Sequence, residues 1–331
     1  MAASETDRID QLAALFGRQR PASSLAIGDD AAVVRSGGEY IVTSVDAVVE
    51  GVHFLRKTYP PRAIGRKATA AALSDLAAMG TLAAEVYVAA GIPADVDGDE
   101  FVELAAGIAE AAEQANAVVG GGDLTESPVL WLSVTVVGYA DRFDDVITRA
   151  GATQGDIVAV TGTLGASAAA IELLAADDPP TVPAQLRQRL TARQLAPTPQ
   201  IELGRALAGL DISAMLDVSD GVARDADNLA RASGHDVEIE LARLPIDPAA
   251  AEFADRLGRD PTTLAAASGE EYELLVALPG ESLAEAQRVC AQNRATLTAI
   301  GSIGPPANED ASARLLDSDG RVVVVSGFEH F

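Results

Sequence analysis

Apolar runs of β type alternate with long Ala-rich segments of helical spacing, and this alternation restricts the chain to layers of strands and helices. In the first part of the chain, the runs 31–34 and 40–49 predict a hairpin around Ser36-Gly37-Gly38. Further strands are predicted at 82–92 and 129–139, and helices at 5–16, from Pro60-Pro61 to about Met79, and at 99–115.

A charged, Gly-containing stretch at 141–156 interrupts this pattern and predicts a connection between domains. Beyond it the alternation resumes, with helices at 164–175, within 178–199 and at 221–233, and strands at 157–162, 212–216, 237–241, 271–278, 296–303 and 321–327. A chain of 331 residues is long enough for two cores of ordinary size. We therefore expect an α/β (α+β) fold with domains at 1–148 and 149–331.

The charge balance narrows the possible partners. The chain has 24 basic and 49 acidic residues, a net charge of −25, which would repel nucleic acid and anionic membrane surfaces. A phosphate ligand would therefore need a divalent metal to bring it in. The only cysteine, Cys290, cannot form an internal disulfide, and the chain shows no signal-peptide pattern and no apolar run of about 18 residues. A cytoplasmic setting is expected.

Aspartates recur just after the strand-like runs, at Asp29, Asp30, Asp46, Asp75, Asp123, Asp217 and Asp220. Any one of them could be an ordinary turn, helix-cap or solvated residue. Asp75, however, lies among Ala, Leu and Met on a stripe that should be buried, where an unpaired charge costs several kcal/mol. Carboxylates gathered from separate strand ends can bind Mg²⁺, which would remove that cost.

Glycine and histidine patterns give weaker signals. "VVGGGDLTES" and "VTGTLGAS" could bring backbone N–H groups close to phosphate oxygens, or could mark only tight turns. "GVHFLRKT" has Arg56 where a P-loop needs its second glycine. The three histidines, His53, His235 and His330, lack zinc-site spacing, and His53 is the one nearest the acidic motifs.

Nine ordered motifs together resemble the thiamine-monophosphate kinase family, from about residue 27 to the C-terminus. They are "IGDDAAVV", "TSVDAVVEGVHF", "ALSDLAAMG", "GGGDLTES", "ITRAGATQGD", "VTGTLGAS", "DVSDGVARD", "SGEEYELL" and "SGFEHF". The resemblance implies a two-domain PurM-like fold. In that fold an N-terminal α/β domain forms a dimeric β-barrel, a C-terminal α/β domain follows, and the protein is a homodimer with ATP bound between the domains.

The same resemblance implies the site residues. The Mg²⁺ ligands would be Asp30, Ser44, Val45, Asp46, Asp75, Asp123, Asp217 and Asp220, with Asp30, Asp46, Asp75 and Asp217 central to catalysis. ATP would contact Gly122, Asp123, Arg149 and Ser219, and thiamine monophosphate would contact His53, Glu271 and Phe328. The chain departs from the family at Val45, in place of Thr, which would leave only a backbone oxygen for metal, and at Glu271, in place of the shorter Asp.

The reaction implied by the resemblance moves the γ-phosphoryl group of ATP directly onto thiamine monophosphate, giving thiamine diphosphate and ADP, as the last step of thiamine diphosphate synthesis. The acceptor phosphate has a second pKa of about 6, so its repulsion from ATP matters more than its deprotonation. Several Mg²⁺ ions would offset that repulsion. Two alternatives stay open: the same fold acting on another acceptor, as in a purine-synthesis relative, and a metal- or nucleotide-binding module without catalysis.

Overall fold

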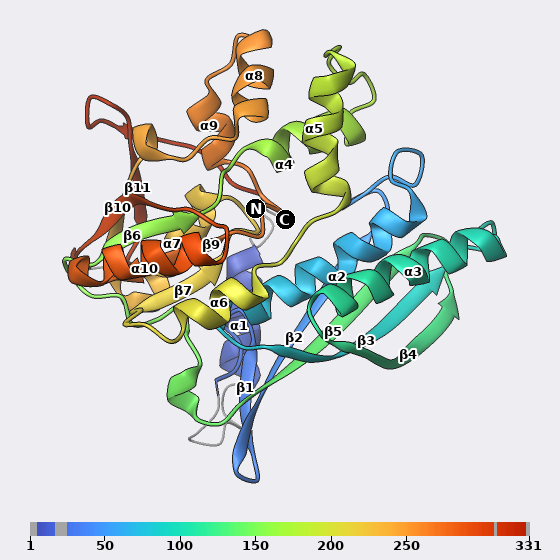
Figure 1. The fold of residues 1–331 in the computed structure, drawn as a ribbon, viewed down its shortest axis with the longest axis horizontal. Helices are drawn as coiled ribbons and strands as arrows, with labels where there is room; N and C mark the ends of the chain where they lie inside the picture. The colour runs from blue at the N-terminus through green and yellow to red at the C-terminus, as the bar shows by residue number, and fades with distance from the viewer. Residues whose placement is uncertain (1–4, 17–24, 308–309, 329–331) are drawn as a thin grey trace.

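The computed structural model describes residues 5–16, 25–307 and 310–328 and contains two sheets (Figure 1). The first sheet has the order β1-β2-β5-β3-β4, in which every neighbouring pair is antiparallel except β3 and β4. Its strands are β1 (Ala32–Ser36), β2 (Glu39–Val49), β3 (Ala83–Ile92), β4 (Val118–Glu126) and β5 (Trp131–Ala140).

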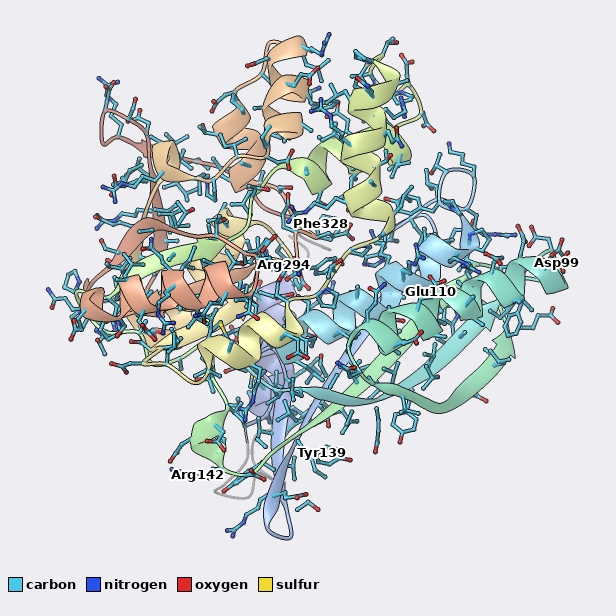
Figure 2. All side chains as sticks on the ribbon, viewed as in Figure 1. Asp99, Glu110, Tyr139, Arg142, Arg294 and Phe328 are labelled. Carbon is cyan, nitrogen blue, oxygen red and sulfur yellow. The ribbon has the colours of Figure 1, made fainter. Side chains whose placement is uncertain are left out.

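Two helices, α2 (Pro61–Ala78) and α3 (Gly98–Gln114), pack against each other beside this sheet (Figure 1). Along β5, the side chains of Leu132, Val134 and Val136 are buried and alternate with half-buried residues, so one face of the strand contacts α2. The other face is more open, and Tyr139 on it is 43% exposed (Figure 2). Asp99 lies in the first turn of α3, at the end of the helix that is remote from the second sheet (Figure 2).

The second sheet has the order β12-β11-β8-β10-β6-β9-β7 and is antiparallel except for the pair β8 and β11. Its strands are β6 (Ile157–Thr161), β7 (Ala214–Asp217), β8 (His235–Glu240), β9 (Leu274–Leu278), β10 (Leu297–Pro306), β11 (Ala313–Leu316) and β12 (Val322–Val323). The helices near this sheet are α6 (Ile201–Leu207), α7 (Val222–Ser233) and α10 (Leu283–Gln292).

A separate group of helices, α4 (Ala166–Ala175), α5 (Ala184–Leu195), α8 (Pro248–Arg256) and α9 (Pro261–Ala266), forms a lobe above the second sheet in Figure 1. Phe253, Leu173 and Leu190 are buried in a small core of their own there. Helix α1 (Glu5–Phe16) has no buried residue. None of the helices in the described ranges is long and apolar enough to span a membrane.

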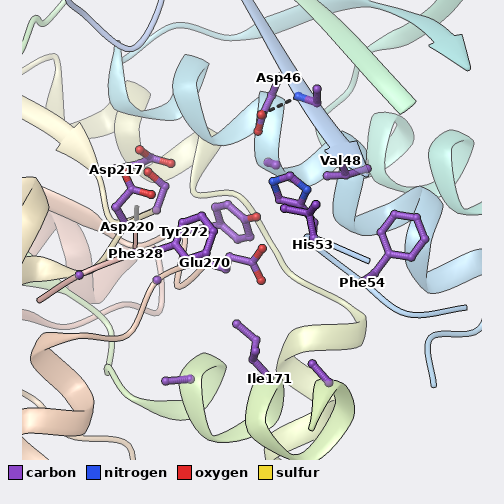
Figure 3. A pocket seen from close by; sticks show the side chains of 18 of the residues that line it. Asp46, Val48, His53, Phe54, Ile171, Asp217, Asp220, Glu270, Tyr272 and Phe328 are labelled. Atoms are coloured by element: carbon purple, nitrogen blue, oxygen red, sulfur yellow. Dashed lines mark hydrogen bonds between the residues drawn. The ribbon is translucent and has the colours of Figure 1, made fainter. Parts of the chain in front are cut away.

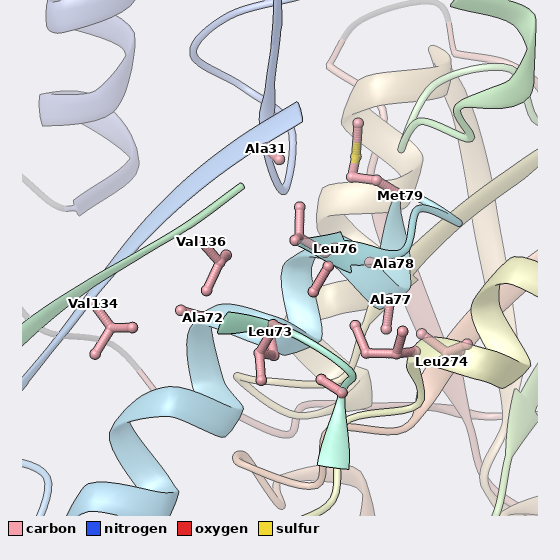
Figure 4. Packing of buried hydrophobic residues seen from close by; sticks show 14 of the residues in the cluster. Ala31, Ala72, Leu73, Leu76, Ala77, Ala78, Met79, Val134, Val136 and Leu274 are labelled. Atoms are coloured by element: carbon pink, nitrogen blue, oxygen red, sulfur yellow. The ribbon is translucent and has the colours of Figure 1, made fainter. Parts of the chain in front are cut away.

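The C-terminal turns of α2 belong to a core that both sheets share. Leu76 and Ala77 lie between Val134 and Val136 of β5 and Leu274 of β9 (Figure 4). The first sheet ends at residue 140 and the second begins at 157, so the division between them falls within the predicted connection. The boundary at 148/149 itself stays a prediction.

The fold confirms the predicted mixed α/β architecture with two sheets, the hairpin β1–β2 and the Pro-initiated helix α2. Of the two alternatives for "VVGGGDLTES", the tight turn was wrong, because residues 120–122 lie within strand β4. Gly122 is required there by the neighbouring strand, because a Cβ at this position would lie 1.8 Å from the Val88 carbonyl oxygen. The terminal "EHF" and His330 lie outside the described residues.

Candidate active site

A cavity of about 690 Å³ opens where the two sheets meet. Its walls come from β2 and α2 on one side, and from the loop after β7, the loop before β9, helix α4 and residues 326–328 on the other. Figure 3 shows the side chains of Asp46, His53, Asp217, Glu270 and Phe328 around it. Of the predicted site residues, those that line the cavity are Asp30, Ser44, Val45, Asp46, His53, Asp75, Asp217, Ser219, Asp220 and Phe328.

Three of the predicted metal ligands meet at one point. Asp30 precedes β1, Asp75 is in α2 and Asp217 ends the fully buried strand β7, yet one carboxylate oxygen of each lies within 4.8 Å of the others. Asp30 Oδ2 and Asp217 Oδ1 are buried without a hydrogen-bond partner in the described protein, while Asp75 accepts a hydrogen bond from Ser44 Oγ. Unpaired carboxylate oxygens in this arrangement fit a hard divalent cation such as Mg²⁺.

The raised pKa values of Asp75 and Asp217 also fit a carboxylate cluster that binds a cation. Burial, followed by repulsion from Asp217, Asp30 and Asp46, raises the pKa of Asp75 well above its usual value. Burial, followed by repulsion from Asp30, raises the pKa of Asp217 from 3.8 to about 7. Two carboxyl groups that resist ionisation this strongly need a cation if they are to be charged together at neutral pH.

Arg149 holds the Asp29–Asp30 turn against the second sheet. Its Nη2 lies 2.6 Å from Asp30 Oδ1, and its backbone N–H donates to both carboxylate oxygens of Asp29 at 3.2 Å. Burial, with added repulsion from Asp30, raises the pKa of Asp29 to about 7. Arg149 itself lies outside the cavity lining, so its predicted contact with ATP stays a prediction.

Strand β2 presents Ser44 and Asp46 on one face. Ser44 is buried, whereas the side chain of Val45, which alternates with it, is 62% exposed on the other face. A metal contact of the Val45 backbone oxygen stays a prediction. Asp46 Oδ1 accepts a hydrogen bond from the Ala47 N–H at 2.6 Å.

His53 and Phe328 also line the cavity. The Nδ1 atom of His53 accepts a hydrogen bond from the Val49 N–H at 3.0 Å, so Nε2 carries the proton of the neutral ring. The Phe328 N–H donates to the Asp220 carbonyl at 3.0 Å, which fixes the C-terminal segment on the loop that carries Asp217 and Asp220. The Phe328 ring is 45% exposed.

Glu271 does not line the cavity; its neighbour Glu270 does. Glu271 is buried and accepts hydrogen bonds from the N–H groups of Gly165 and Ser167 and from Ser268 Oγ, with Arg193 Nε 3.4 Å away. Its burial raises its pKa to about 7. The amides of "VTGTLGAS" expected to approach phosphate therefore donate to Glu271 in this structure, and a contact between Glu271 and substrate stays a prediction without support from its position.

Gly122 and Asp123 also lie apart from the cavity lining. Every residue of β4 is exposed, and Asp123 stands opposite Ala89 of β3 in the register. Their predicted roles in ATP and metal binding stay predictions.

Several residues that complete the cavity wall were not predicted from the sequence. They are Tyr59, Glu270 and Tyr272. Lys67 of α2 does not line the cavity but forms an ion pair with Glu270. A lysine inside an Ala-rich helical stripe, eight positions before Asp75, was the available sequence signal for Lys67.

The cavity is strongly acidic. Among its described lining residues there is no Lys or Arg, whereas eight carboxylate side chains line it: Glu5, Asp30, Asp46, Asp75, Glu172, Asp217, Asp220 and Glu270. Without cations such a cavity would repel any phosphate compound.

Comparison with known proteins gives consistent results over nearly the whole chain. Residues 28–140 match the family "AIR synthase related protein, N-terminal domain", and residues 153–312 match its "C-terminal domain". The chain is 36% identical over 223 residues to the thiamine-monophosphate kinase of Aquifex aeolicus, covering 67% of this chain and 71% of that protein. It is 34% identical over 313 residues to the Haemophilus influenzae thiamine-monophosphate kinase, covering 93% and 92%.

A solved structure, AaThiL complexed with AMPPCP and TMP, superposes with a TM-score of 0.86 at 30% sequence identity, covering 100% of this chain and 99% of that one. The hydrogenase maturation protein HypE in complex with ATP is 18% identical with a TM-score of 0.68, covering 95% and 90%, and is similar in fold.

Proposed function

The chain belongs to the thiamine-monophosphate kinase family, and on that premise we propose that it transfers the γ-phosphoryl group of ATP to thiamine monophosphate, giving thiamine diphosphate and ADP. The mixed α/β fold with both AIR-synthase-related domains is the PurM-like architecture expected from the motifs. In this reaction the P–O bond between the γ-phosphoryl group and ADP breaks, and a new P–O bond forms to the acceptor phosphate.

The observation that carries this proposal is the conflict between an acidic cavity and two anionic substrates. Eight carboxylates and no Lys or Arg line the described cavity, so phosphate groups can enter only with cations. The oxygens of Asp30, Asp75 and Asp217 within 4.8 Å of one another are the best candidates to hold Mg²⁺, with Asp46 and Asp220 nearby. When bound, Mg²⁺ would neutralise phosphate charge and align donor with acceptor.

The protein's own residues would mainly orient the reactants. The acceptor phosphate, with a second pKa of about 6, is largely a dianion near neutrality and needs little help from a general base. We assign the contact with thiamine monophosphate to His53 and Phe328, which line the cavity, and the exposed Phe328 ring would offer a stacking surface for its heterocycles. We assign ATP to Ser219, which lines the cavity, and to Gly122, Asp123 and Arg149, which lie outside its lining.

We propose further that the protein is a homodimer formed through the first sheet, in which two copies complete a β-barrel. Strand β4 is an exposed edge, and its Val118, Val119 and Leu124 are 67%, 42% and 61% exposed. Such an edge is a template for pairing with another chain. A mass in solution near 33.9 kDa at working concentration, measured by light scattering, would contradict the dimer. The cytoplasm remains the proposed compartment.

The test of the reaction is chromatographic detection of thiamine diphosphate after incubation with ATP, Mg²⁺ and thiamine monophosphate. Asp46→Asn and Asp75→Asn should each lower turnover by orders of magnitude while the far-UV circular dichroism is retained. Asp211→Asn, an exposed aspartate, is the matched control and should be unaffected. ATP consumption without thiamine diphosphate, or with another phosphate acceptor in a panel, would favour the purine-synthesis-like alternative; no ATP turnover would favour a binding module.

A further inference from the structure

Lys67 is the one buried cation among the residues that the structure describes. It is 1% exposed, its Nζ lies 2.5 Å from Glu270 Oε2 and 5.5 Å from the centre of the Tyr59 ring, and Gln194 also donates to Glu270 Oε2. Burying an ammonium group costs free energy unless it is closely paired, so the Lys67 ammonium group must stay in contact with these partners.

The ion pair joins the two sides of the cavity. Lys67 and Asp75 both belong to α2, separated by eight residues or about 12 Å of helix rise, and Ala71 and Asp75 on the same stripe line the cavity. Glu270 belongs to the loop before β9, 203 residues further along the chain from Lys67. Lys67 therefore connects the helix that carries Asp75 to the opposite wall.

The loop that carries Glu270 is fastened to the loop that carries Asp217 and Asp220. The N–H of Glu270 donates to the Ser219 carbonyl at 2.7 Å, and the N–H of Tyr272 donates to the Val218 carbonyl at 2.9 Å. Glu270 and Tyr272 have φ values of 56° and 53°, a left-handed conformation that non-glycine residues adopt only when their surroundings impose it. A shift of Glu270 would therefore be passed to the 217–220 loop.

Contacts on both sides of Asp75 hold helix α2 in place. On the C-terminal side, Leu76 and Ala77 belong to the shared core, and α6 contacts the backbone at Ala77, where a Cβ on Gly204 would lie 2.0 Å from the Ala77 carbonyl oxygen. On the N-terminal side the anchor to the opposite wall is the Lys67–Glu270 pair. Between the two, Asp75 must stay close to Asp217 although both carboxylates repel each other.

We infer that Lys67 is a positioning residue: through Glu270 it sets the separation of Asp75 from Asp217 and so the cation affinity of the cluster formed with Asp30. This inference rests on the proposed function, because it requires that the cluster binds a divalent cation. Lys67 does not line the cavity and would not touch substrate.

The experiment is a titration of the nucleotide-free protein with Mn²⁺, followed by electron paramagnetic resonance. Lys67→Met keeps the length of the side chain and removes its charge, and should weaken Mn²⁺ binding about tenfold or more, the range found when groups that orient metal ligands are removed. Lys67→Arg keeps the charge and should recover much of the affinity. The matched control is Lys57→Met. Lys57 Nζ lies 3.4 Å from Asp177 Oδ1, and this ion pair also joins the two sides of the cavity, but both of its side chains are exposed.

A second readout separates positioning from general stability. In turnover, Lys67→Met should raise the Mg²⁺ concentration needed for half-maximal rate and leave the KM for thiamine monophosphate unchanged. If Lys67→Met fails to fold, Lys67→Gln, which keeps a hydrogen-bond donor, is measured in the same way. A folded Lys67→Met or Lys67→Gln that binds Mn²⁺ within about twofold of the unsubstituted protein would overturn the inference, as would an equal loss in Lys57→Met. Absence of Mn²⁺ binding by the unsubstituted protein would instead contradict the proposed function.

Discussion

Asp217→Asn should stabilise the metal-free protein, although it should abolish cation binding. In the folded state burial and Asp30 raise the pKa of Asp217 from 3.8 to about 7. Because this folded-state pKa lies above the unfolded-state value, the metal-free protein loses stability as the pH rises from about 4 to about 7. Each pKa unit corresponds to about 1.4 kcal/mol, so ionising Asp217 costs on the order of 4 kcal/mol at about pH 8.

Asparagine has the shape of aspartate without its charge, so the variant should recover about 2–4 kcal/mol at about pH 8, or about 3–6 °C in Tm for a chain of this size. The gain should shrink as the pH is lowered toward 4, where the aspartic acid is already protonated in both states. The assay is thermal unfolding in excess EDTA over this pH range. Addition of Mg²⁺ should raise the Tm of the unsubstituted protein and leave that of the variant unchanged.

Asp211→Asn is the control for a generic effect of removing one negative charge from an acidic protein. Asp211 is exposed and lies shortly before β7, so its substitution should leave Tm almost unchanged at every pH. The reasoning would be refuted if Asp217→Asn were no more stable than the unsubstituted protein in EDTA at about pH 8. A gain of the same size at every pH would refute it equally, because the effect would then not come from the carboxylate charge.

Three further outcomes follow from the structure. Phe328→Ala should raise the KM for thiamine monophosphate about fivefold at unchanged kcat, since loss of ring stacking costs about 1 kcal/mol; steady-state kinetics with an unchanged KM would exclude Phe328 from the substrate contact. Gly65→Ala should destabilise the protein by about 2–3 kcal/mol, because its Cβ would lie 2.1 Å from the Leu104 carbonyl oxygen and force α2 away from α3. In the same denaturant titration Gly98→Ala, which has open space around it, should be nearly neutral, and equal losses in both would refute the packing argument. Mn²⁺ affinity should fall as the pH drops below about 7, because Asp217 must release its proton to bind metal. An Mn²⁺ affinity that stays the same from about pH 6 to about pH 8 would contradict this.

The convergence of Asp30, Asp75 and Asp217 could be predicted because carboxylates stood beside apolar runs or on a stripe that should be buried, although only Asp217 ends a strand, whereas Asp30 precedes β1 and Asp75 lies in α2. Long elements such as α2 and β5 were predictable for a similar reason, since their apolar spacing repeats over several turns or pleats. The short helices α8 and α9 were not predicted, although Asp247-Pro248 and Asp260-Pro261 are typical N-terminal cap sequences.

Other parts of the site depend on tertiary contacts that local pattern does not contain. The sequence "SGEEYEL" does not say which glutamate faces the cavity, because that choice depends on the left-handed backbone at Glu270 and Tyr272. The glycines of "VVGGGDLTES" left a tight turn open, but Gly122 lies in a strand and is required there by the close approach of Val88. Lys67 likewise finds its partner only through the fold, since Glu270 is remote in sequence.

The core shared by both sheets has a consequence for dissecting the molecule. Leu76 and Ala77 of α2 pack in the same cluster as Leu274 and Val276 of β9, so cutting the chain in the 141–156 connection would leave apolar surface bare on each fragment. Neither fragment should be soluble alone, and a calorimetric scan of the intact chain should show one heat-absorption peak in place of two.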